Sequence, residues 1–236
     1  MTIDRTELIR ALAYYTRLGR NEANEAPSLP SREAAVIIRS LMAIAYALCG
    51  GIASWLAHGR LAGHLVGAVV IILAHLWLTN GRDLRRPLEF IPRPGASSTA
   101  DEARQGIVTI ALLLPAVAVL ALVLAGGCYA IIPVMAIGTA IGCEMTSADA
   151  APTPFSLRQP RCWGIALLAS WLPSLLFAGS MAGVRSSTLR LLLLSLVCLL
   201  LTPWLRSLSS RPSGRAASIL LGEGIASIIY LLIACF

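Results

Sequence analysis

Long runs of apolar residues, separated by short polar connections, dominate the chain from residue 34 onward. A helix that crosses a bilayer needs about 20 mostly apolar residues, and seven segments meet or approach this length. They are Ala34 to Ala57, Leu61 to Thr79, Gly106 to Gly126, Cys128 to Cys143, Trp163 to Gly183, Thr188 to Leu205 and Ala216 to Phe236. The pattern predicts an all-α fold, a polytopic transmembrane helix bundle of about seven spans over residues 34–236.

The first 33 residues have a different pattern and form a separate N-terminal segment. Asp4 followed by Glu7 is typical of a helix start, and apolar residues then recur at helical spacing from Leu8 to Leu18, until Gly19 offers a stop. We therefore expect a short amphipathic helix that lies at the cytoplasmic membrane interface. A helix that binds a partner protein is the alternative. The segment has no apolar core of a cleaved signal peptide.

Composition agrees with a membrane protein and narrows the choice of partners. Hydrophobic residues make up 57% of the chain, charged residues 13%, and the mean hydropathy is +0.76. All 19 basic residues are arginine, and in such a chain positive charge indicates orientation and attraction to anionic lipid rather than nucleic-acid binding. The expected partner is the phospholipid bilayer, and no nucleic acid is expected. The six cysteines stand singly without a CxxC pair, which favours buried apolar side chains.

The arginines are distributed unevenly between alternate connections. Fifteen fall in the leading segment and in the second-to-third, fourth-to-fifth and sixth-to-seventh connections, whereas the opposite connections hold only Arg60 and Arg185. Cytoplasmic loops carry the excess of positive charge, so the N-terminus is expected in the cytoplasm and the C-terminus outside. Arg39 and Arg190 lie near span ends, where their side chains are expected to reach the headgroups.

Ionisable residues within spans are the first candidates for function, because burying them in lipid costs free energy. Glu223 lies about two turns into the last span and faces either a polar cavity or a partner side chain; a hydrogen-bonded glutamate at a helix interface is the alternative. His75 lies near the cytoplasmic end of the second span. His64 lies near the other end, roughly 16 Å away, so the two histidines cannot bind one metal.

The connection over residues 80–105 follows His75 and is rich in charge. Its carboxylates, with Asp83 and Glu89 foremost, are of the type that holds Mg²⁺ against a phosphate. Its arginines are of the type that binds phosphate oxygens: Arg82, Arg85, Arg86 and Arg104. A solvated, positively charged loop without a ligand is the alternative. The chain contains no Walker loop, dinucleotide fingerprint, HExxH or GxSxG motif.

Four places spread over most of the chain carry a family resemblance. They are L-A-Y-Y-T-R-L-G (Leu12 to Gly19), A-H-L (Ala74 to Leu76), G-R-D-L-R-R-P-L-E-F (Gly81 to Phe90) with D-E-A-R-Q-G (Asp101 to Gly106), and G-R-A-A-S-I-L-L-G-E (Gly214 to Glu223). In order they resemble L-x-F-L-T-R-L-P, the start of H-L-D-G-L-A-D-T-x-D-G, G-R-D-x-x-R-R-L-E-I-M with K-D-S-R-I-G, and G-D-T-L-G-A-x-x-E. The family is cobalamin synthase, the membrane-bound adenosylcobinamide-GDP ribazoletransferases.

The resemblance implies a bacterial inner-membrane enzyme of cobalamin biosynthesis that joins GDP-activated adenosylcobinamide to α-ribazole and uses Mg²⁺. It implies His75, Asp83 and Glu223 as catalytic residues, Asp83 and Glu89 as metal ligands, and Arg82, Arg85, Arg86 and Arg104 as substrate-binding residues. The chain departs from the family where the aspartates after His-Leu are expected, because residues 77–81 read W-L-T-N-G. The family's closing glutamate falls on Gly222, one residue before Glu223.

Three interpretations therefore stay open. The chain is a divergent transferase, or it is a non-catalytic membrane scaffold or subunit that kept the fold and binds other membrane proteins of the corrinoid pathway. A small transporter has less support, because no inverted repeat is visible.

Overall fold

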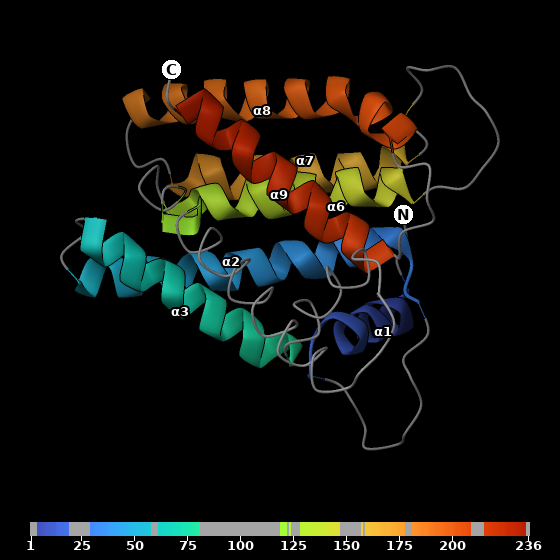
Figure 1. Cartoon of the computed structure of the whole chain (residues 1–236), viewed down its shortest axis with the longest axis horizontal. Helices are drawn as coiled ribbons and strands as arrows, with labels where there is room; N and C mark the ends of the chain where they lie inside the picture. Colours follow the sequence, from blue (N-terminus) through green and yellow to red (C-terminus); the bar gives the residue numbers. More distant parts are fainter. Residues whose placement is uncertain are drawn as a thin grey trace, which may run out of the picture.

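The computed structural model describes residues 4–18, 29–57, 61–80, 119–121, 123, 128–146, 157, 159–177, 181–208 and 215–234. Within these ranges the regular elements are all helical, which confirms the predicted all-α class. Along the chain they are α1 (Arg5–Tyr15), α2 (Arg32–Leu56), α3 (Leu61–Thr79), a 3₁₀ turn η2 (Cys128–Ala130), α6 (Ile131–Met145), α7 (Pro160–Phe177), α8 (Met181–Leu208) and α9 (Arg215–Ala234). In Figure 1, α2, α6, α7 and α8 share one direction, and α3 and α9 cross it obliquely.

The N-terminal helix begins where the sequence predicts. Asp4 is its N-cap, and the side chain accepts hydrogen bonds from the Thr6 hydroxyl at 2.6 Å and the Thr6 backbone N–H at 3.1 Å. These bonds hold the pKa of Asp4 below its usual range. The helix ends at Tyr15, four residues before the predicted stop at Gly19. The Thr16 hydroxyl donates to the Leu12 carbonyl at 2.6 Å. A backbone carbonyl of the last helical turn thus has a side-chain donor.

Helix α1 is docked onto the bundle. Its buried residues Ala11 and Tyr15 belong to the main hydrophobic core, and the helix packs along the start of α2. The backbone N–H of Arg17 donates to the Leu78 carbonyl at the end of α3, at 2.7 Å. The Glu7 carboxylate accepts from the Ser31 N–H at 3.0 Å. The predicted amphipathic helix is thus present, with one face on protein; its place at the membrane interface stays a prediction.

The predicted spans agree with the helices to different degrees. The second predicted span coincides with α3, and the first with α2 to within two residues at its start. The predicted boundary between the fifth and sixth spans, after Gly183, is wrong, because α7 ends at Phe177 and α8 already begins at Met181. Hydropathy marks the apolar part of a helix, whereas the hydrogen-bonded helix continues through the polar turn around Arg185. The third predicted span, Gly106 to Gly126, lies mostly outside the described residues.

Helix α6 is the centre of the bundle. It packs against α2, α7, α8 and α9, and all its residues from Ile131 to Glu144 are buried. An apolar helix buried on every side belongs to the core rather than to a lipid-facing surface. Its 15 residues span about 22 Å, which is less than the hydrocarbon thickness of about 30 Å. Among the described residues, the helices long and apolar enough to cross a membrane are α2, α3 and the Ser187–Leu205 part of α8.

Small residues allow α6 and α9 to approach closely. A Cβ atom added to Gly142 would lie 2.4 Å from the Ile219 Cα atom, and one added to Gly222 would lie 2.2 Å from the Gly138 carbonyl oxygen. Gly138 and Gly142 are four residues apart on α6, as are Ser218 and Gly222 on α9, so each pair lies on one helix face. This spacing of small residues is typical of tight helix contacts in membranes.

The cysteine prediction is confirmed in part. Cys143, Cys162 and Cys198 are buried free thiols in the described part of the chain, whereas Cys49 is exposed on α2.

We predict that Gly142→Ala destabilises the protein, because its new methyl group meets the α9 backbone, which a rotamer change cannot move. Overpacking of this kind costs about 1–3 kcal/mol of unfolding free energy. Gly164→Ala in α7 is the matched control, since a Cβ there meets nothing within 4 Å and alanine favours the helix. Thermal unfolding in detergent micelles measures both. An equal or higher Tm for Gly142→Ala would contradict the close α6–α9 contact.

Candidate functional site

The candidate site is built around Glu223, the acidic residue of α9. Gly138 of α6 faces the Glu223 backbone, where a Cβ would lie 2.4 Å from the glutamate Cα atom. The missing side chain lets the carboxylate extend past α6. The acidic group is therefore directed into the interior of the bundle, between α6 and α2.

Arg39 of α2 binds this carboxylate with two nitrogen atoms. Its Nε donates to Oε1 at 2.9 Å and its Nη2 donates to Oε2 at 2.5 Å. The Arg39 side chain is 1% exposed and that of Glu223 is 14% exposed. Parallel bonds between a guanidinium and a carboxylate are strong and directional. The prediction that Arg39 reaches the headgroups is therefore wrong: a nearby carboxylate offers it a partner inside the protein.

Two further residues complete the surroundings of the ion pair. The Thr139 hydroxyl of α6 donates to the Met135 carbonyl at 2.7 Å, and its oxygen lies 3.3 Å from Glu223 Oε1. The Tyr15 ring of α1 lies under the Arg39 guanidinium, 5.9 Å from its centroid to Cζ. A cation over an aromatic face is stabilised electrostatically. Helices α1, α2, α6 and α9 thus all meet at one buried, internally neutral charge pair.

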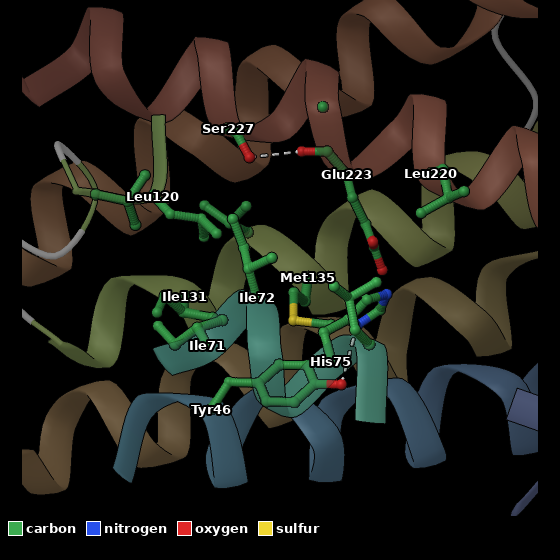
Figure 2. Close-up of a pocket in the computed structure, with 14 residues that line it drawn as sticks. Tyr46, Ile71, Ile72, His75, Leu120, Ile131, Met135, Leu220, Glu223 and Ser227 are labelled. Atoms are coloured by element: carbon green, nitrogen blue, oxygen red, sulfur yellow. Dashed lines mark hydrogen bonds between the residues drawn. The ribbon is translucent and has the colours of Figure 1, made fainter. Parts of the chain in front are cut away.

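His75 and Tyr46 form a second polar pair beside the first. The Tyr46 hydroxyl of α2 lies 2.9 Å from His75 Nδ1 of α3, and the two rings meet edge to face. The Thr79 hydroxyl donates to the His75 carbonyl at 2.8 Å. In Figure 2 the Glu223 side chain extends from α9 toward the His75 ring, and both residues line the same pocket. The imidazole is thereby oriented by Tyr46 of α2, on the lining of the pocket that Glu223 of α9 shares.

A cavity of about 220 Å³ lies between α2, α3, α6 and α9. Its walls are aliphatic over most of their area, and Tyr46, His75, Glu223 and Ser227 provide the polar groups. The Ser227 hydroxyl donates to the Glu223 carbonyl at 2.8 Å (Figure 2). The arrangement offers a bound molecule an apolar pocket with a polar end. Glu223 is the charged residue among the described lining residues, and Arg39 neutralises it.

The structure brings together two of the predicted site residues, His75 and Glu223, which are 148 positions apart in the chain. The others lie outside the described residues: Asp83, Glu89, Arg82, Arg85, Arg86 and Arg104. Sequence reasoning missed Arg39, although an arginine and a glutamate inside spans are expected to pair. It also missed Tyr46 and Thr139, because uncharged polar residues are common in apolar helices and carry no signal of their own.

Three of the four sequence stretches singled out above meet in this region. Tyr15, from the first, contacts Arg39, and Glu223, from the last, binds it. His75, from the second, shares the cavity with Glu223. Arg17, also from the first stretch, stacks its guanidinium over the Trp77 ring, with Cζ 4.7 Å from the centroid.

The expected Mg²⁺ finds no ligand set in the described residues. No group of three His, Cys, Asp or Glu side chains converges there. Both Glu223 oxygens already accept from Arg39, and a cation in that place would face the guanidinium charge. No chemical step is therefore assigned to a metal at this cavity. Comparison of the chain with protein-family models, curated proteins and solved structures finds no match.

We predict that removing either member of the buried pair is destabilising. Glu223→Leu leaves a buried guanidinium, at a cost of about 3–5 kcal/mol in unfolding free energy, and Arg39→Met leaves a partly buried carboxylate, at a smaller cost. The double variant is expected to recover most of this loss, because no unpaired charge remains. Reversible unfolding in mixed micelles provides the double-mutant cycle.

Arg10→Met is the control, since Arg10 pairs with Glu7 at the surface and is 44% exposed. It should change the unfolding free energy by at most about 1 kcal/mol. Single variants of Arg39 and Glu223 that lose no more than Arg10→Met would show that the buried pair does not hold the bundle together.

Proposed function

We propose that the chain is a multi-pass membrane phosphotransferase of the cobalamin synthase type. In this proposal it has seven spans in a bacterial inner membrane, with the N-terminus in the cytoplasm and the C-terminus outside. It transfers the cobinamide phosphate of GDP-activated adenosylcobinamide to α-ribazole. The observation that carries the proposal is the convergence of three family-like stretches, far apart in the chain, around the Arg39–Glu223 pair and His75.

The reaction forms one phosphorus–oxygen bond and breaks another. A ribazole hydroxyl attacks the phosphorus on the cobinamide side of the pyrophosphate, the anhydride bond breaks, and GMP leaves. His75, oriented by Tyr46, accepts the proton of the attacking hydroxyl. The arginines of the 80–105 connection bind the phosphate oxygens and stabilise the charge on them. Glu223 acts as a positioning residue, because Arg39 occupies its carboxylate.

Two observations favour a second candidate, a non-catalytic membrane scaffold. Both Glu223 oxygens accept hydrogen bonds from Arg39, so the carboxylate has a structural role. The family's first aspartates are replaced by residues 77–81, W-L-T-N-G. A chain of this kind keeps the helix packing without the reaction and binds other membrane proteins of the corrinoid pathway.

We predict that the protein in lipid nanodiscs releases GMP from adenosylcobinamide-GDP when α-ribazole and Mg²⁺ are supplied. His75→Gln should lower the rate by about 100-fold or more, the usual contribution of a general base. His64→Gln is the matched control, because His64 lies at the other end of α3 and pairs with Ser54 at 2.9 Å. Its rate should stay within about twofold of the unaltered protein.

GMP release is measured beside an active synthase in the same nanodiscs. No release from the unaltered chain, while the synthase turns over, overturns the transferase proposal and leaves the scaffold. Equal losses in the two histidine variants would remove His75 from the reaction. Asp83→Asn should abolish release if Asp83 acts at the phosphates.

A further inference from the structure

We propose that the cavity between α2, α3, α6 and α9 is a binding site for a neutral, single-ring aromatic alcohol, a phenol, whose hydroxyl group bonds to the Tyr46–His75 pair. The inference goes beyond the transferase proposal, because it concerns binding to this chain without nucleotide or corrinoid. It rests on the volume of the cavity, its lining and the state of its charges.

The volume selects a small ligand. A dry cavity of about 150 Å³ with Leu, Ile and Phe walls binds benzene, whereas drug-sized ligands need about 300 Å³ or more. At about 220 Å³ this cavity has room for one ring with one or two small substituents. The walls suit a ring as well, since Ile71, Ile131 and Leu220 are aliphatic and Met135 offers a thioether sulfur (Figure 2).

The charges select a neutral ligand. Arg39 and Glu223 neutralise each other, and the carboxylate oxygens that an ammonium group would need are held by the guanidinium. An anion or cation entering the cavity would lose its hydration without gaining a counterion from the described lining residues. A neutral molecule avoids this cost, and burial of its apolar atoms favours binding.

The polar end of the cavity selects a hydroxyl group. The Tyr46 hydroxyl and the His75 ring lie together on the cavity lining, with the hydroxyl oxygen 2.9 Å from Nδ1. A hydroxyl group both donates and accepts hydrogen bonds, so it suits a polar end of this kind. The Tyr46 hydroxyl belongs to α2 and the His75 ring to α3, so the contact between them fixes both groups on the cavity wall. A ligand hydroxyl that lies against this pair joins an existing hydrogen-bond chain, while its ring contacts the aliphatic walls.

The test compares 4-fluorophenol with 4-fluorotoluene, which has nearly the same shape and no hydroxyl group. Both are titrated by ¹⁹F NMR against the full chain in nanodiscs, with empty nanodiscs as the reference for partitioning into lipid. We expect 4-fluorophenol to bind about 3- to 10-fold more tightly, the usual net effect of one hydrogen bond. Tyr46→Phe should abolish this preference and leave the binding of 4-fluorotoluene unchanged.

Two further variants separate the cavity from the rest of the molecule. Tyr129→Phe is the matched control, since its hydroxyl bonds to Ser187 at 3.0 Å and Tyr129 does not line the cavity; it should change neither affinity. Val134→Phe places a ring in the cavity and should weaken both ligands at least 10-fold. Circular dichroism identifies any variant that fails to fold. If Val134→Phe fails to fold, the loss of the 4-fluorophenol preference in Tyr46→Phe is the result that tests the site.

The proposal is overturned by equal affinities for the two probes, by a preference that survives Tyr46→Phe, or by signals no larger than those of empty nanodiscs. None of these outcomes depends on GMP release. A chain without transferase activity that prefers 4-fluorophenol keeps this site and loses only the transferase proposal. A chain that releases GMP but shows no preference loses only this site.

Discussion

The ion pair between Arg39 and Glu223 is the interaction on which the arrangement of the helices depends. Its two residues are 184 positions apart, on the first long helix and the last one described. Neither charge is stable alone in an apolar interior, since each would lose its hydration without compensation. The ion pair therefore fixes the distance between α2 and α9 and the rotation of each helix about its own axis. The other helices must pack around that constraint.

Helix α6 makes this pairing possible because it lacks side chains where α9 crosses it. Without Cβ atoms at Gly138 and Gly142, the α9 backbone approaches α6 closely enough for the Glu223 carboxylate to pass. The Thr139 hydroxyl oxygen lies beside the two glycines, 3.3 Å from Glu223 Oε1. The close α6–α9 contact and the buried ion pair thus depend on each other. Dispersion and close packing hold the helices together, and the polar bonds fix their register.

The sequence predicted the helices well and their contacts poorly. Apolar length is a local property, so α3 and most of α2 followed from it, and the Asp4 cap followed from its spacing to Glu7. The partner of Glu223 is a non-local property. Hydropathy does not tell which face of a helix meets which neighbour, and an arginine near a predicted span end has the same local pattern whether it reaches lipid or a carboxylate.

The same reasoning limits what chemistry the cavity can support. Both oxygens of the Glu223 carboxylate are bound by the Arg39 guanidinium, which fixes the orientation of the carboxylate. A carboxylate held in this way is better suited to positioning than to proton transfer. His75 differs, because an imidazole ring nitrogen can accept a proton and the ring is oriented by Tyr46 from another helix. The ion pair therefore makes His75 the group at this cavity best suited to proton transfer. It also keeps net charge off the wall beside it, which favours neutral hydroxyl groups as the molecules that approach the imidazole.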